Sequence, residues 1–429
     1  MTAQTHDQAA QTAPAPLTGL RVIELADART QFCAKLLADM GADVIAVEPP
    51  GGSAARRIGP FVDDVPDINR SLHFWYYNTS KRGVTLSLAH AEGRALFARL
   101  VAGADVVIDG AAPGALDALG SGFDAFAAAQ PALIWAAITP FGQTGPYRDF
   151  TMTDLTSMAF GGPMASCGYD DLPGAPPIRP EAFHSFHMGG EYAAMGVLIA
   201  LLERLTSGLG QYLDVSIHEA CAATTEGAFP NWEYFRRLVI RQTGRHAAPS
   251  TTSRWQFHCA DGRDINMIGG GIPRNPRSWP PLLDWMEREG LVDDLREPRY
   301  TAIVTQNPYN RGADAAHLAA TIGRFVEALP AEEVYRGGQA LHMPWAPVRS
   351  PDENLDDPHW RDRGFFVEVA HPELGRSVTY PGLPYLFLVS PGRISRRAPL
   401  LGEHTYEVYV RELGLTPDEL RPLFEQGVV

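Results

Sequence analysis

The sequence predicts an α/β protein in which helices cover a parallel β-sheet. Residues 17–48 contain two short apolar strands, at 22–25 and 44–47, and apolar residues recur at helical spacing between them. Strands joined through a helix in this way pair in parallel. Strand and helix patterns continue to alternate as far as residue 139, which favours an α/β sheet with helical cover. The chain of 429 residues is too long for one compact core, so we expect two domains.

The remaining elements are expected in the same alternating order. Strands are predicted at 84–88, 105–109, 132–139 and 212–216, and helices at 90–102, 116–130, 154–160 and 188–205. From residue 220 the pattern changes to aromatic and Arg-rich helices with short strands between them. We therefore expect a disordered lead over 1–16, the first part of a large domain over 17–219, a smaller domain over 220–340, and a return to the large domain over 341–429.

Composition narrows the class of protein. Lys and Arg number 36 and Asp and Glu number 50, a net charge of −14 that argues against nucleic-acid binding. No apolar run approaches the roughly 18 or more residues that a membrane-spanning helix needs. The polar N-terminus lacks the apolar core of a signal peptide, and the four cysteines form no CxxC pair. These features predict a cytoplasmic protein with reduced thiols and no membrane association.

Ligands of parallel sheets gather outside the carboxyl ends of the strands, where residues 26–31 and 48–52 are expected. No GxGxxG motif follows the first strand, so a dinucleotide fingerprint is not supported. Arg56, Lys81 and Arg82 flank the predicted strands and could hold phosphates, although solvated surface charge explains them equally well.

The loop FGQTGPY at 141–147 is a second candidate for ligand contact. Its glycines and proline permit close approach of the backbone to a ligand near Gln143 and Gly145. A purely structural turn is the alternative.

Taken together, ordered motifs along nearly the whole chain resemble the family III CoA-transferases, which include formyl-CoA and carnitine CoA-transferases and the related α-methylacyl-CoA racemases. The motifs that carry the resemblance are LTGLRVIEL, KLLADMGADVIAVEPPGG, FGQTGPYRD, ALLER, GQYLDVSIHEA, DPHWRDRGFFVEVAHPELG and APLLGEHT. The resemblance implies an enzyme that acts on CoA thioesters, with a Rossmann-like large domain and a smaller α+β domain. It also implies a homodimer in which each chain threads through the other.

The family's CoA contacts are only partly present. The resemblance implies that Arg56, Lys81 and Arg82 contact the CoA phosphates. The family segment N-F-R-P-G, which helps to hold CoA, reads GAAPG at 110–114. Three expected contact side chains are therefore replaced by small residues.

The expected catalytic residues are missing as well. In the transferases a carboxylate before the long helix attacks the acyl-CoA carbonyl, and alignment places Phe186 at its position. The racemases use a His-Asp pair, which here falls on Thr153 and again on Phe186. Asp154 stands where the family also has Asp, although it could simply cap the following helix.

The segment PEAFHSFHMGGEY offers substitutes for the missing carboxylate. His184 or His187 could act as a general base, and Glu181 could be a relocated nucleophile. The helix is expected to begin near Gly189, after both histidines. No third ligand at a recognisable spacing accompanies the two histidines, so no metal site is predicted. Alternatively, these residues pack a domain or subunit junction as satisfied polar groups.

These residues and motifs lead to one principal hypothesis and two alternatives. The first is transfer of coenzyme A between an acyl-CoA and a carboxylic acid acceptor. The second is isomerisation, racemisation, lysis or hydrolysis of an acyl-CoA, catalysed by a histidine or glutamate. The third is a catalytically inactive CoA-binding homologue, because fold does not imply function.

Overall fold

The structure is a computed structural model and describes residues 13–225, 227–306 and 312–429. Most of the lead expected over 1–16 lies outside the described residues. The chain divides into two compact units, which are described separately below. The first comprises residues up to Gly161, Pro180–Thr224 and Asp357–Val429, and the second comprises Gly162–Arg179 and Thr225–Asp356.

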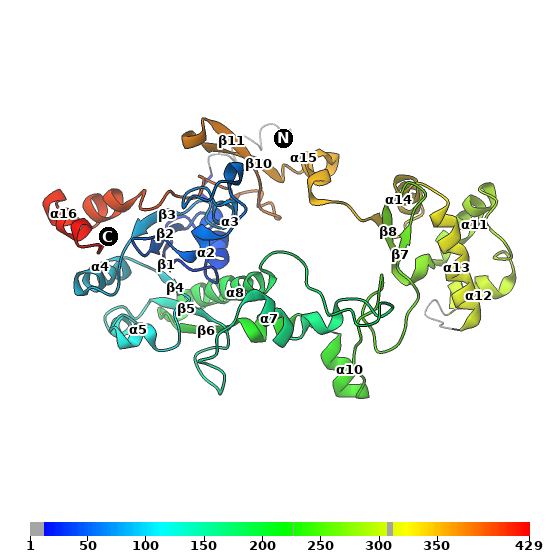
Figure 1. Ribbon diagram of the computed structural model, residues 1–429, viewed down its shortest axis with the longest axis horizontal. Helices are drawn as coiled ribbons and strands as arrows, with labels where there is room; N and C mark the ends of the chain where they lie inside the picture. Colours follow the sequence, from blue (N-terminus) through cyan, green and yellow to red (C-terminus); the bar gives the residue numbers. More distant parts are fainter. Residues whose placement is uncertain (1–12, 226, 307–311) are drawn as a thin grey trace. The chain divides into compact units, whose positions relative to one another are not determined.

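A parallel sheet forms the centre of the first unit (Figure 1). Within the described residues it has six strands in the order β3-β2-β1-β4-β5-β6, and every neighbouring pair is parallel. The strands are β1 (Arg21–Leu25), β2 (Asp43–Glu48), β3 (Arg82–Thr85), β4 (Val106–Asp109), β5 (Ile134–Thr139) and β6 (Tyr212–Ser216). This is the strand order of a doubly wound dinucleotide-type sheet. The predicted α/β class is thereby confirmed.

Helices cover both faces of this sheet. The helices of the first unit are α2 (Gln31–Asp39), α3 (Leu72–Tyr77), α4 (Ala91–Ala102), α5 (Ala115–Ala118), α6 (Asp124–Ala127), α7 (Asp154–Phe160), α8 (His184–Ser207), α9 (Ile217–Ala223), α15 (Pro358–Asp362) and α16 (Pro417–Glu425). On one face α2 packs against α8, and α8 packs in turn against β5 and α9. On the other face, side chains of α4 and α16 share a core with β1, β2 and β3. The C-terminal segment adds the antiparallel hairpin of β10 (Phe366–His371) and β11 (Arg376–Pro381), followed by a π-helix at Glu407–Glu412.

Two helices differ from their predicted bounds. The single helix expected over 116–130 is divided into α5 and α6, because Gly120 adopts a left-handed conformation with φ 64°. Helix α8 begins at His184, before the predicted start near Gly189. His184 and His187 therefore lie on the first turn of α8.

Part of the apolar surface of helix α8 is used for packing. By length and composition alone it is the one helix, among the described residues, that could cross a membrane. Gly189 and Gly190 are buried, as are its three alanines before Leu201. A Cβ atom added to Gly189 would lie 2.8 Å from Ile217, and one added to Gly190 would lie 3.1 Å from the backbone nitrogen of Cys33. Both glycines thus permit close approach of α8 to α9 and α2.

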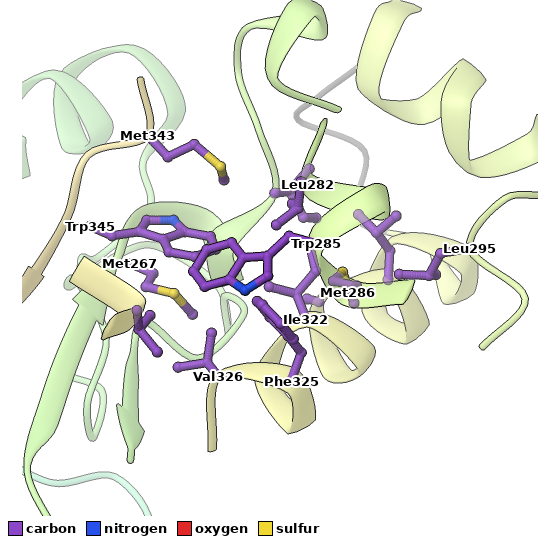
Figure 2. Close-up of a cluster of buried hydrophobic side chains, with 14 of the residues drawn as sticks. Met267, Leu282, Trp285, Met286, Leu295, Ile322, Phe325, Val326, Met343 and Trp345 are labelled. Carbon is purple, nitrogen blue, oxygen red and sulfur yellow. The ribbon is translucent and has the colours of Figure 1, made fainter. Parts of the chain in front are cut away.

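The second unit is an α+β structure with its own hydrophobic core. An antiparallel sheet in the order β7-β8-β9 packs with helices. The elements are α10 (Ala228–Phe235), β7 (Gln256–His258), β8 (Asp264–Met267), α11 (Trp279–Arg288), α12 (Pro298–Gln306), α13 (Ala313–Glu327), α14 (Ala331–Ala340) and β9 (Trp345–Pro347). Figure 2 shows Trp285, Trp345 and Phe325 at the centre of the core. The rings of Trp285 and Phe325 meet edge to face at 4.8 Å.

Candidate active site

A cavity of about 380 Å³ opens at the carboxyl ends of the central strands. Its wall includes Asp27 and Arg29 after β1, Pro49 after β2, and residues 110–112 after β4. Nε of Arg29 lies 2.6 Å from a carboxylate oxygen of Asp27. Open parallel sheets bind their ligands at this edge.

A second cavity, of about 580 Å³, lies beyond β4 and β5 and shares residues 111, 112 and 116 with the first. Asp109 lines it, and burial raises the pKa of its carboxyl group to about 6, although Trp135 Nε1 donates to it at 2.6 Å. Arg148 is the cationic residue of the wall. Of the two loop residues predicted to meet a ligand, Gln143 lines this cavity and Gly145 does not.

The Gln143 loop is held by a backbone contact. The backbone N–H of Gln143 donates to both carboxylate oxygens of Asp214, at 3.0 and 2.9 Å. Gly145 has φ 89°, a conformation that favours glycine. The geometry accounts for the loop as a structural turn beside the cavity, and a ligand contact there stays a prediction.

Arg56 is buried and fully engaged. Its guanidinium donates to both oxygens of Glu48 at 2.7 Å, to the carbonyl of Pro399 at 3.0 Å, and stacks over Phe74. Neither side chain of the Arg56–Glu48 pair is exposed. A CoA phosphate could reach Arg56 only by displacing these partners, so the contacts favour a structural role.

Lys81 and Arg82 also form ion pairs with carboxylates of the same chain. Lys81 Nζ donates to Glu24 at 2.7 Å, and neither side chain is exposed. Arg82 bonds to Asp43, to Glu407 at 2.8 Å and to Glu412, thereby fastening β3 to the π-helix. A role for either residue in CoA binding stays a prediction that these contacts do not favour.

Asp154 connects α7 to the start of α8. Thr153 caps α7, and Asp154 is its first residue. Its carboxylate accepts hydrogen bonds from the backbone N–H of Ser185 at 2.9 Å and from the Ser185 hydroxyl at 2.7 Å. A carboxylate is stabilised at the N-terminus of a helix, so the contacts fit a cap of α8. The cap of the following helix α7, which the sequence offered for Asp154, is made by Thr153 instead.

His187 contacts aromatic residues of two other helices. Its Nε2 is hydrogen-bonded to the hydroxyl of Tyr77 on α3, and its ring packs on Phe32 of α2 at 4.5 Å. Burial, together with the neighbouring His184, lowers the pKa of His187 to about 4, against an opposing effect of Asp154. His187 is therefore neutral at pH 7 and is a weak base.

His73, which the sequence did not single out, belongs to the same cluster. It lies on α3 one turn before Tyr77, with ring centroids 4.6 Å apart, and Gln31 bonds its Nε2 at 2.8 Å. Burial and the charge of His187 lower the pKa of His73 to about 4. The available signal was the spacing of His73 and Tyr77, which places both on one face of a helix.

The remaining candidates lie just before α8 and on its first turn. Glu181 is exposed in the loop that leads into the helix. The ring of Phe186 is half-buried and stacks on Phe183 at 5.7 Å. Ring centroids of His184 and His187 are 5.8 Å apart. Among the described residues, no group of three or more His, Cys, Asp or Glu side chains could hold a metal ion.

Comparison with known proteins identifies the family. A family model described as CoA-transferase family III matches residues 17–405. The chain belongs to CoA-transferase family III. A subunit named succinyl-CoA:(R)-benzylsuccinate CoA-transferase subunit BbsE, from Thauera aromatica, is 33% identical over 95% of this chain and 97% of its own length. Succinyl-CoA–D-citramalate CoA-transferase of Chloroflexus aurantiacus is 32% identical over 98% of this chain and 99% of its own.

Comparison with solved structures supports the same family. The crystal structure of a CaiB/BaiF family protein from Brucella suis superposes with a TM-score of 0.77 and 26% identity, covering 93% of this chain and 99% of that one. The resemblance to this family and the presence of an enzyme fold are thus confirmed.

The assignment of the family's nucleophile position to Phe186 stays a prediction. A phenyl ring offers neither a nucleophile nor a base. The surroundings of Phe186 include aromatic rings and two imidazoles with lowered pKa values, those of His73 and His187.

Proposed function

We propose that the chain takes part in transfer of coenzyme A from an acyl-CoA to a carboxylic acid, with succinyl-CoA as the first donor to test. The proposal is supported chiefly by the family match over residues 17–405. Three relatives at 31–33% identity are named CoA-transferases, two for succinyl-CoA and one for formyl-CoA. Acyl-CoA would enter as a substrate, without a resident cofactor.

The reaction needs a carboxylate that Phe186 does not supply. A carboxylate attacks the thioester carbonyl to form an anhydride and expels the CoA thiolate. The thiolate then attacks the enzyme's own acyl carbon, which releases the donor acid and leaves an enzyme–CoA thioester. The acceptor carboxylate then attacks this thioester, which forms a second mixed anhydride and expels the CoA thiolate. The thiolate attacks the acceptor's acyl carbon, which gives the new acyl-CoA and regenerates the enzyme carboxylate.

We infer that this carboxylate comes from a second, homologous chain. The Thauera relative is named as a subunit, and subunits named alpha and beta of succinyl-CoA–L-malate CoA-transferase both match this chain, at 28% and 30% identity. Helix α8 also carries an exposed apolar stripe formed by Ile199, Leu202 and Leu205, which are 66%, 67% and 83% exposed. Exposed patches of this kind mark interfaces between proteins.

The alternative is a homodimer that uses its own carboxylate. Glu181 is exposed and precedes α8, so it is the candidate nucleophile in that case. Asp154 is less suited, because its carboxylate already accepts two hydrogen bonds from Ser185.

An isomerase or hydrolase based on His187 is less well supported. A general base works best when its pKa lies near the working pH. The pKa of about 4 places His187 well below that range.

Borohydride trapping followed by peptide mass spectrometry tests the proposal, because borohydride reduces an enzyme–CoA thioester to an alcohol. Incubated alone with succinyl-CoA, the chain is expected to give no trapped adduct. The Phe186→Asp variant should restore an adduct at position 186. Co-expression with a family III chain that has Asp at this position should yield an adduct on that chain, together with transfer to a dicarboxylic acid.

A different result would assign the nucleophile to this chain. An adduct on Glu181 of the unmodified chain, lost in Glu181→Gln, would refute the two-chain proposal. Native mass spectrometry supplies the matched control, since it shows whether one or two kinds of chain are present.

A further inference from the structure

A directional chain of hydrogen bonds ends on the ring of His73. Lys81 Nζ is a pure donor and bonds Asn78 Oδ1 at 2.9 Å, which fixes the orientation of the Asn78 amide. Asn78 Nδ2 in turn faces Gln31 Oε1 at 3.4 Å. The Gln31 amide nitrogen therefore donates to His73 Nε2, at 2.8 Å. A neutral His73 must then carry its proton on Nδ1.

The hydroxyl of Tyr77 fixes the tautomer of His187 in the same way. Burial raises the pKa of Tyr77, so its hydroxyl keeps its proton. Within the described part of the chain, Nε2 of His187 is the acceptor that this buried hydroxyl reaches. A buried hydroxyl needs an acceptor for its proton. Tyr77 therefore donates, and His187 also carries its proton on Nδ1.

Each imidazole therefore has an Nδ1–H group that is available to donate a further hydrogen bond. Neither Nδ1 atom has a hydrogen-bond partner among the described residues, and both rings are only partly buried. Both rings contact the ring of Tyr77, with centroids 4.6 and 5.4 Å from its centroid.

We propose that His73 and His187 form a pair of neutral hydrogen-bond donors for an anionic oxygen of the acid or acyl substrate, with Gln31 and Tyr77 as positioning residues. The choice of a carboxylate or acyl oxygen as ligand rests on the proposed CoA transfer. Preorganised donors stabilise the negative charge that develops on a carbonyl oxygen under nucleophilic attack.

The surroundings keep the pair neutral. His187 is faced by Tyr77 from α3, by His184 from its own helix and by Asp154 from α7. His73 is faced by His187 and by the uncharged amide of Gln31. Asp154 is the one anionic group in this set, and its influence is outweighed by burial and by His184. A neutral imidazole donates a hydrogen bond without acting as a proton source.

Nitrogen NMR of the full chain labelled with 15N-histidine tests the tautomers directly. At pH 7.5, His73 and His187 should both show protonated Nδ1 and unprotonated Nε2. Tyr77→Phe should remove this preference for His187 and leave that of His73 unchanged. Nε2-protonated rings in the unmodified chain would overturn the proposal.

Titration with succinate tests ligand binding, and two substitutions separate a donor from a base. Asparagine places an amide N–H near the position of Nδ1, whereas glutamine places it near Nε2. His187→Gln should weaken succinate binding about tenfold or more, and His187→Asn less than about threefold. The exposed His90→Asn is the control and should leave binding unchanged. Equal losses in both His187 variants, or no succinate-induced shift of either Nδ1 signal, would contradict the proposal.

These measurements are independent of catalysis. Absence of CoA transfer together with succinate-induced shifts would refute the proposed function and leave the donor pair standing. CoA transfer without succinate-induced shifts would support the proposed function and refute the donor pair.

Discussion

The hydroxyl of Tyr77 bonds Nε2 of His187, although the two residues are 110 positions apart in the chain. The bond joins the end of α3 to the first turn of α8. It holds an uncharged imidazole one residue from Phe186, the position of the expected nucleophile.

The low pKa of His187 should make folding stability sensitive to acid. The folded-state pKa is about 4 and an unfolded histidine has a pKa near 6.5, so the unfolded chain binds more protons between these values. This contribution is complete above pH about 6.5 and is lost as the pH falls toward 4. Between pH 7.5 and 5.0, wild type should lose about 1 kcal/mol more stability than His187→Asn, after allowance for solvent screening. Urea unfolding at the two pH values measures the difference, and equal losses would contradict the shifted pKa.

Removal of the Arg56 side chain should strongly destabilise the first unit. Arg56→Ala leaves the buried carboxylate of Glu48 without its cation, at a cost of about 3–5 kcal/mol. Arg57→Ala is the matched control because Arg57 is exposed, and its effect should stay within about 0.5 kcal/mol. Chemical denaturation measures both. A small loss for Arg56→Ala together with weaker CoA binding would restore Arg56 as a phosphate contact.

These ion pairs do not favour the predicted contact of Arg56 and Lys81 with CoA, which stays a prediction. The family resemblance implied that both residues contact the CoA phosphates, whereas position beside a strand is explained equally well by solvated surface charge. Glu48 and Glu24 lie within apolar strands, and buried carboxylates require a cation. The signal was present in the sequence, but only the fold shows which cation reaches which carboxylate.

More of the fold than of the site could be predicted from the sequence, because secondary structure follows from local residue patterns. The strands and helix of residues 21–48 follow from apolar periodicity. The start of α8 could not be predicted in that way. Gly189 and Gly190 suggest a helix boundary, yet both lie inside α8. Glycine is needed there because the neighbouring α9 and α2 leave no room for a side chain. Likewise, His73 and His187 are far apart in sequence and meet through Tyr77 only in the folded chain.

Substitution of Asp154 should separate capping from catalysis. Asp154→Ala removes the acceptor of two Ser185 hydrogen bonds and should cost about 2 kcal/mol. Asp154→Asn keeps an acceptor and should recover about half of that loss. Exposed Asp149→Ala is the control and should be near neutral. Thermal unfolding measures the series. Full stability of Asp154→Ala would rule out the cap.

Gly337 of α14 should tolerate no side chain. A Cβ atom there would lie 2.1 Å from the ring of Trp285, so Gly337→Ala should destabilise the second unit by about 1–3 kcal/mol and alter tryptophan fluorescence. Gly51→Ala meets nothing within 4 Å and should leave both unchanged. An unaltered spectrum for Gly337→Ala would contradict the close approach of α14 to Trp285, whose ring is drawn in Figure 2.

Cysteine reactivity should be confined to one site. Burial raises the pKa of Cys33, and raises those of Cys221 and Cys259 to about 11, whereas Cys167 is partly exposed. Thiolates are the reactive species, so a disulfide reagent at pH 8 should modify Cys167 first. Peptide mapping identifies the site, and Cys167→Ser should abolish the fast phase. A fast phase that survives this substitution would show that a buried thiol is accessible.

The apolar stripe of α8 has a consequence for handling the isolated chain. Copies that carry a net charge of −14 repel one another in dilute buffer, while Ile199, Leu202 and Leu205 favour contact. Added salt screens the repulsion over about 10 Å at 0.1 M and leaves the apolar attraction intact. Raising the ionic strength should therefore favour self-association of the isolated chain. A physiological partner that covers the stripe would keep the chain soluble.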